Sequence, residues 1–272
     1  MAPQRNAILG VLLVLSAAAW TLLTWQSAGS GSNMAMASPT MGMSALLFLA
    51  IWVVMMVAMM FPTAAPMILA FHKIQASKRQ RGAPFVATWI FIAAYMLVWS
   101  VSGIGAYAGA LGAQALAKWA ALPTSATARI SGGILIAAGI YQLTPLKDLC
   151  LSKCRSPLSF IVASWREGIS GALQMGLRHG VFCLGCCWLL FLILFPLGMM
   201  NVAAMAIITL VIFAEKTLPW SRPIAHATAA ALIAYGIAVV ATPRTLPALM
   251  LEGEMPTAAP AAPMNMNMGT MH

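Results

Sequence analysis

Runs of about 20 apolar residues, the length that a helix needs to cross the hydrocarbon of a bilayer, recur along the whole chain. Because a bilayer offers the backbone no water, such segments satisfy their own hydrogen bonds as helices. Only 7% of the residues are charged, whereas a soluble domain has about 25%. The sequence therefore predicts an all-α, multi-pass membrane bundle of about seven transmembrane helices, at residues 7–25, 45–71, 85–113, 129–146, 180–200, 202–215 and 223–241.

Lysine and arginine are distributed unevenly between the predicted loops. If the N-terminus is cytoplasmic, only Lys118, Arg129 and Arg244 of the 15 lie outside. An excess of cytoplasmic Lys and Arg sets the orientation of multi-pass proteins, so we predict the N-terminus inside and the C-terminus outside. This clustering accounts for the net charge of +10 without nucleic acid as a partner. The partner that we expect is the lipid bilayer.

Three regions follow from this pattern. Residues 1–44 would hold the first helix and an outer loop, residues 45–241 the bundle, and residues 242–272 an external tail too poor in large hydrophobic residues to fold alone. The first apolar run contains small residues, as a signal peptide does. However, Trp20 and Trp25 follow it as an interfacial aromatic belt would, so we expect a retained helix.

Two methionine-rich strings lie in the predicted outer segments, on the same face of the membrane. Each sits among polar, Pro, Gly and Ala residues, so we expect neither to pack into a core. Closely spaced thioethers outside a core suggest capture of a soft metal ion, Cu(I) above all. The candidate ligands are Met34, Met36, Met41 and Met43 in the first string, and Met264, Met266, Met268, Met271 and His272 in the second.

The second apolar run carries four methionines within six residues. They are Met55, Met56, Met59 and Met60. Side chains four residues apart share a helix face, so the sulfurs form two adjacent rows near the bilayer midplane. Relay of a soft metal and plain packing both remain open, since methionine fills irregular gaps. Pro62 and Pro66 follow, and we expect them to kink the helix and to free carbonyls near residue 58.

Three of the five cysteines lie close together in the fifth apolar run. Cys183 precedes Cys186 by three residues and Cys187 by four, so one helix face would carry all three. Thiolates are strong ligands for soft metals. His179, one turn earlier, could add a ligand or take a proton, although alone it is more often interfacial. The alternative is that buried cysteines act as small hydrophobic residues.

The other two cysteines, Cys150 and Cys154, lie one helical turn apart in a predicted inner loop, residues 147–179. Cytosolic thiols are normally reduced, which favours metal or redox chemistry over structural disulfides. Lys147, Lys153 and Arg155 are expected to favour the thiolates. A tetrathiolate zinc site that joins this pair to the helical cysteines is also open.

Glu215 and Lys216 end the sixth apolar run. A carboxylate near the membrane is costly unless it is paired. Lys216, Lys147 or Arg178 could pair with Glu215, and we expect an interfacial ion pair.

Four motifs of this chain resemble those of a known family. They are Met55-Met56-x-x-Met59-Met60-x-Pro62, Pro145-Leu146-Lys147 with Cys150 and Cys154-Arg155, Gly185-Cys186-Cys187-Trp188, and Glu215-Lys216. Over roughly residues 45–240 the chain resembles the bacterial domain-of-unknown-function 2182 family, integral membrane proteins that are predicted to bind metal and are often labelled copper chaperones. The resemblance implies copper handling in the bacterial inner membrane.

We therefore expect a membrane protein that binds Cu(I) and delivers or transports it, with Met ligands outside and Cys ligands inside, and with zinc as the alternative metal. The alternative function is an accessory or assembly subunit of a membrane copper enzyme, such as an oxidase or monooxygenase, whose subunits would be partners. A thiol redox protein ranks below both, because the usual Cys-x-x-Cys at a soluble helix start is missing. The sequence shows no phosphate loop, nucleotide fingerprint or paired catalytic carboxylates, so we do not expect an enzyme.

Overall fold

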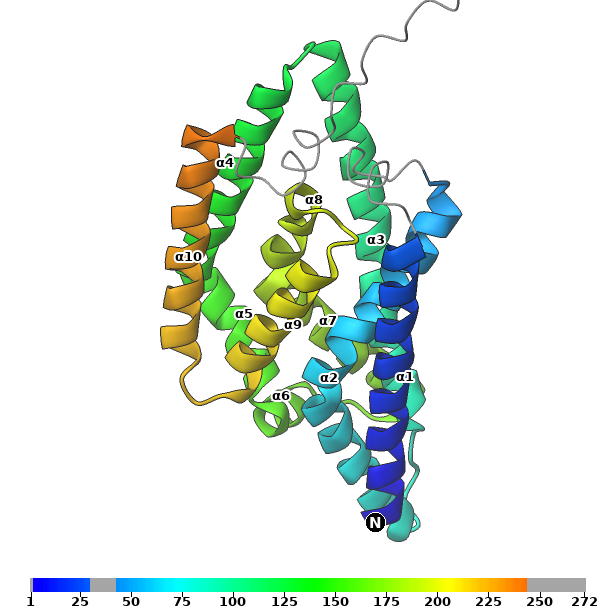
Figure 1. Cartoon of the computed structure of the whole chain (residues 1–272). Helices are drawn as coiled ribbons and strands as arrows, with labels where there is room; N and C mark the ends of the chain where they lie inside the picture. Colours follow the sequence, from blue (N-terminus) through cyan, green and yellow to red (C-terminus); the bar gives the residue numbers. More distant parts are fainter. Residues whose placement is uncertain (1, 30–42, 244–272) are drawn as a thin grey trace, which may run out of the picture.

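The computed structural model describes residues 2–29 and 43–243, and these residues form helices and connections without any strand (Figure 1). The all-α prediction is confirmed for them. The helices are α1 (Ala2–Gly29), α2 (Ala45–Gln80), α3 (Thr88–Trp119), α4 (Thr124–Gln142), α5 (Pro145–Arg155), α6 (Pro157–Ser164), α7 (Gly168–Leu192), α8 (Leu194–Leu197), α9 (Val202–Thr217) and α10 (Ser221–Ala241).

Within the described residues, five helical segments are long and apolar enough to cross a membrane. They are α1, α2, α3, α7 continued by α8, and α10. A sixth span is possible if α4 and α5, which meet at a bend of 63°, cross together. Helix α9 covers the predicted run 202–215 but has only 16 residues. The chain is thus a multi-pass membrane protein, while the count of seven and the orientation stay predictions.

Helix α1 is joined to α2 at the carbonyl that a proline leaves unpaired. Pro62 has no N–H to offer the carbonyl of Ala58 four residues earlier. Ser16 Oγ donates to that carbonyl at 2.8 Å and Trp20 Nε1 donates to it at 3.1 Å. The prediction of a freed carbonyl near residue 58 is confirmed, and its partners come from the neighbouring helix. Helix α2 itself continues through both prolines to Gln80.

The bundle has two flanks and a central layer (Figure 1). Helices α4 and α10 lie side by side on one flank and α1 lies beside α2 on the other, with α7 and α9 between them. The α4–α10 contact is close because both helices present glycine to each other. A Cβ atom at Gly236 would lie 2.8 Å from the carbonyl oxygen of Gly132. Small residues allow helix backbones to approach in this way in membranes.

The prediction of a loop at residues 147–179 is wrong, because the structure places helices α5 and α6 and the first turns of α7 there. Pro145 and Pro157 each stand at the first position of a short helix, where their missing N–H costs nothing. The Thr144 hydroxyl accepts from the Lys147 N–H at 3.4 Å and caps α5. Helices of 11 and 8 residues are too short to appear as 20-residue apolar runs.

Candidate metal centre

Three thiols lie on the buried face of α7. Cys183, Cys186 and Cys187 are each at most 3% exposed. The thiols of Cys186 and Cys187 both donate to the backbone carbonyl of Cys183, at 3.0 Å and 2.9 Å. The helical spacing of three and four residues therefore puts all three sulfurs next to one another, as the sequence predicts.

Helix α5 adds the other two cysteines to this face. The Cys154 thiol lies close enough to Cys183 and Cys186 to interact with both. The Cys150 Sγ atom lies over Gly185, where an added Cβ would be 2.8 Å away. Gly185 thus leaves the room that Cys150 occupies. All five cysteines converge from α5 and α7, which pack against each other after the 63° bend between α4 and α5.

A buried lysine that the sequence did not single out as a thiol partner contacts the centre of this cluster. Lys216 is only 8% exposed, and its Nζ atom lies 3.0 Å from Cys183 Sγ and 3.3 Å from Thr63 Oγ1. From the sequence, Lys216 is expected only as a partner for Glu215. Its contact with a cysteine 33 residues away depends on how α9 rotates against α7.

The cations that were expected beside Cys150 and Cys154 are engaged elsewhere. Lys147 donates to both carboxylate oxygens of Glu215, at 2.8 Å and 2.7 Å, and both residues are buried. Arg155 donates to the Ser221 hydroxyl and to the carbonyl of Leu218. For Lys147 and Arg155 the expectation that they favour the two thiolates is therefore wrong. The expected ion pair of Glu215 forms with Lys147 and is buried within the bundle.

These two contacts have a different effect, since they fasten α5 to the bundle. Lys147 ties its first turn to α9, and Arg155 ties its last turn to the segment between α9 and α10. Tyr141, just before the bend, donates to the carbonyl of Gly185 at 2.5 Å. Two contacts thus fasten α5 to α9 and to the start of α10, and Tyr141 fastens the end of α4 to α7, the helix that carries the other thiols.

Aromatic side chains pack against one side of the cluster. The Tyr95 hydroxyl lies 3.2 Å from Cys183 Sγ. His179 stacks on Tyr95 at 5.4 Å between ring centroids, and Phe160 meets the imidazole edge-on at 5.7 Å. His179 is 2% exposed and therefore buried within the bundle, and neither ring nitrogen has a hydrogen-bond partner among the described residues. A buried imidazole with two free nitrogens one turn from Cys183 is available to a ligand.

The four methionines of α2 are all buried in the core, none more than 2% exposed. Met60 Sδ accepts from the Thr63 hydroxyl at 3.8 Å, and Thr63 in turn contacts Lys216. Met60 is thus separated from Cys183 by two side chains. Packing and metal relay remain compatible with this burial, because each needs the sulfur inside the bundle.

Most of the two methionine-rich strings lies outside the described residues. This applies to Met34, Met36, Met41, Met264, Met266, Met268, Met271 and His272. Met43, which the structure describes, is half-buried and packs against the hydrophobic core. For this residue the expectation that the string makes no core contact is wrong.

Within residues 2–29 and 43–243, no three His, Cys, Asp or Glu side chains stand in an arrangement that already fits a metal ion. The thiols are turned toward protein groups, such as the carbonyl of Cys183. The side chains are close neighbours, but their sulfur atoms do not share a common centre.

The fold and this cluster define a class: an all-helical, multi-pass membrane protein with a buried group of thiols and a buried ammonium. A family model described as PpoB2, copper chaperone, matches residues 49–239, and the chain belongs to this family. The resemblance found from the sequence motifs is thereby confirmed. The match includes all five cysteines and the α2 methionines, and it begins after α1. No curated protein and no solved structure matches the chain.

Proposed function

We propose that this protein binds Cu(I) at the cluster of five cysteines on α5 and α7 and passes the ion on to an acceptor. The observation that supports the proposal most is the convergence of these thiols from two separate helices in a member of a copper chaperone family. Soft thiolate ligands suit Cu(I). Copper is then cargo, and the protein is a carrier and not an enzyme.

Cys183 is the central ligand in this proposal, because it contacts Cys154, Lys216 and Tyr95 together. Cu(I) needs only two or three donors, which Cys183 can complete with Cys154 or with a neighbour on α7. The thiols that now donate to a carbonyl would rotate toward the ion and lose their protons, so that binding releases protons. His179, with no competing hydrogen bond among the described residues, is the nearest additional donor.

The charge of Lys216 favours Cu(I) over zinc. Two thiolates and Cu(I) carry a net charge of −1, which the ammonium of Lys216 neutralises. A zinc ion bound by the same two thiolates carries no net charge and would leave the ammonium of Lys216 uncompensated in the buried site. Because net charge is expensive inside a membrane protein, the neutral arrangement is the more stable one.

The methionines of α2 provide a route to the cluster in this proposal. Thioethers are neutral and bind weakly, whereas thiolates bind tightly. Copper collected by the outer methionine strings would move along the α2 sulfurs to Met60 and then to Cys183. The contacts from Met60 through Thr63 and Lys216 support the last step. Delivery to a copper enzyme in the bacterial inner membrane completes the proposal.

The test is copper stoichiometry of the purified protein by elemental analysis, with X-ray absorption to identify sulfur ligands. We compare the wild type with a Cys183→Ser/Cys186→Ser/Cys187→Ser variant and a Cys150→Ser/Cys154→Ser variant. Ser152→Ala, at an exposed position of α5, is the control. We expect the triple variant to lose its copper and the double variant to bind more weakly. Unchanged copper in the triple variant contradicts the proposal.

A further inference from the structure

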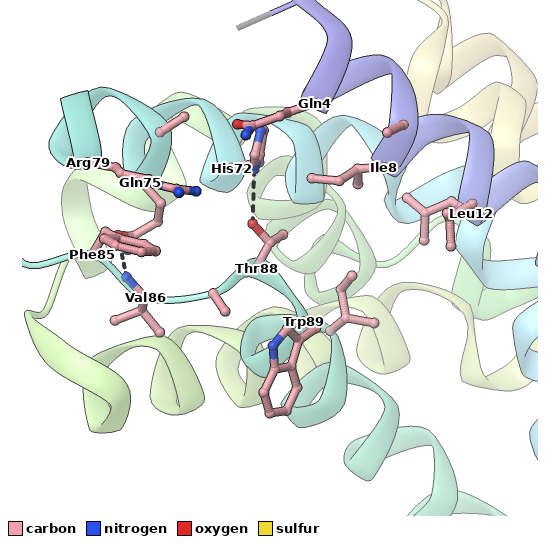
Figure 2. A pocket seen from close by; sticks show the side chains of 15 residues that line it. Gln4, Ile8, Leu12, His72, Gln75, Arg79, Phe85, Val86, Thr88 and Trp89 are labelled. Atoms are coloured by element: carbon pink, nitrogen blue, oxygen red, sulfur yellow. Dashed lines mark hydrogen bonds between the residues drawn. The ribbon is translucent and has the colours of Figure 1, made fainter.

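A cavity lies apart from the thiols, between the start of α1, the end of α2 and the start of α3. Its volume is about 490 Å³, within the usual range of about 300–1,000 Å³ for ligand pockets. Figure 2 shows Ile8 and Leu12 of α1 on one side and Trp89 of α3 below, which make its walls apolar. Most polar groups of the cavity, His72, Gln75 and Arg79, come from α2, with Gln4 of α1 and Thr88 of α3 beside them (Figure 2).

One of these polar groups is an imidazole with an unused nitrogen. His72 Nδ1 pairs with the Thr88 hydroxyl at 3.2 Å (Figure 2). His72 Nε2 is buried and has no hydrogen-bond partner in the described part of the chain. The neighbouring Gln75 is occupied, because its Oε1 accepts from the Val86 N–H at 3.0 Å. In the tautomer whose Nδ1 accepts from the Thr88 hydroxyl, Nε2 carries the hydrogen. A buried donor without a partner is costly, so a ligand that accepts from Nε2–H would be stabilised here.

A cation stands at the rim of the same cavity. The guanidinium of Arg79 lies over the Phe85 ring, 5.1 Å from its centroid, and this stacking holds the charge at the mouth. Figure 2 places Arg79 and Phe85 at one end of the cavity and Leu12 at the other. The cavity therefore has a positive end and an apolar end.

The level of the cavity in the membrane follows from the length of α2. Its 36 residues span roughly 54 Å at about 1.5 Å per residue, well beyond the roughly 30 Å of hydrocarbon. Because the apolar part of α2 begins at Ala45, its last turns lie among the lipid headgroups. Lys78 and Arg79 close the helix at that level.

We propose that this cavity binds one anionic phospholipid. An acyl chain lies along the apolar walls of α1 and α3, an ester carbonyl accepts from His72 Nε2–H, and the phosphate pairs with Arg79. A neutral apolar ligand would leave both polar groups without a partner, whereas an anionic lipid complements the charge and the hydrophobic walls together. The bound lipid fastens α1, which lies outside the family match, to the matched bundle.

Native mass spectrometry of the full chain, with equal amounts of phosphatidylglycerol and phosphatidylcholine, tests the proposal. We expect one phosphatidylglycerol adduct that excess inorganic phosphate does not displace. Arg79→Gln should lower the preference for phosphatidylglycerol about fivefold, the effect of roughly one cation at a membrane surface. Arg81→Gln, an equally exposed arginine that does not line the cavity, should leave the preference unchanged.

A second pair of variants tests the apolar end. Ile8→Trp fills the cavity and should remove the adduct, whereas Val14→Trp, on an exposed face of α1, should retain it. The proposal is overturned if Ile8→Trp keeps the lipid as the wild type does, if Arg81→Gln and Arg79→Gln have equal effects, or if phosphatidylcholine binds as well as phosphatidylglycerol. If Ile8→Trp fails to fold, the comparison of Arg79→Gln with Arg81→Gln still tests the proposal.

Discussion

Lys216→Met removes the positive charge that contacts the proposed copper site, and it should change which metal the site prefers. Methionine has a similar length and no charge. The Thr63 hydroxyl keeps its bond to the carbonyl of Met60 at 3.0 Å, so the substitution leaves no polar group of Thr63 unpaired. The variant should therefore fold and still present all five thiols.

The size of the change follows from one distance. Lys216 Nζ lies 3.0 Å from Cys183 Sγ, and a metal–sulfur bond of about 2.3 Å puts the ion within roughly 5 Å of the ammonium. At an effective dielectric constant of about 20, each positive charge on the ion then costs about 3 kcal/mol. Zn(II) carries one charge more than Cu(I), so removing the ammonium should favour zinc by about a hundredfold relative to copper. Lys216 also attracts the thiolates, but this attraction is the same for both metals, so it cancels in the ratio of their affinities.

The assay is competition for each metal with a chromophoric chelator, from which the ratio of the two affinities is obtained. We expect the copper-to-zinc ratio to fall by about two orders of magnitude in Lys216→Met, and to be retained in Lys216→Arg. Lys153→Met removes the same charge from an exposed position of α5 and is the control. A ratio that stays unchanged in Lys216→Met, or that changes equally in Lys153→Met, refutes the charge argument.

Ser16→Ala should lower the free energy of unfolding in detergent by roughly 1 kcal/mol, because the carbonyl freed by the proline in α2 loses one donor; an unchanged thermal midpoint would contradict this. Gly236→Ala places a Cβ 2.8 Å from a backbone carbonyl oxygen of α4 and should cost about 1–3 kcal/mol. Gly133→Ala meets nothing within 4 Å and is its control, so equal midpoints for both variants would exclude close packing as the cause. Hydrogen bonding from Lys78 lowers the pKa of the Glu167 carboxyl. This ion pair therefore stabilises the protein at pH values above the pKa that Glu167 has in the unfolded chain. The stabilisation is lost as the pH falls through the lower pKa that Glu167 has in the folded protein. Between neutral pH and about pH 3, the thermal midpoint of Glu167→Gln should fall less than that of the wild type, and parallel curves would argue against the pair.

Local chemistry made much of the fold predictable. Each long apolar run became largely helical, although the run 129–146 is divided between α4 and α5 and the run 180–200 between α7 and α8. A chain that cannot expose its backbone to lipid has few other choices. Pro62 predicted a free carbonyl, since the missing N–H is a property of the residue itself. The sequence reading failed at residues 147–179, where α5 and α6 are too short to show a long apolar run.

The candidate site was predictable only where its residues are close in the chain. Spacing along one helix placed Cys183, Cys186 and Cys187 together, and the structure agrees. The burial of His179 and the contact of Lys216 with Cys183 could not be read in this way. Glu215 had three plausible partners in the sequence, and the structure pairs it with Lys147, 68 residues away.

The sequence by itself determined the class of protein, the apolar helices and the inventory of thiol and thioether side chains, because these depend on composition and on the 3.6-residue period. Only the tertiary structure decided that α5 folds back on α7 and that Lys216 faces a thiol. Both outcomes depend on the bend after Gln142 and on the rotation of packed helices about their axes. Those rotations are set by the contacts of the whole bundle, which no single segment contains.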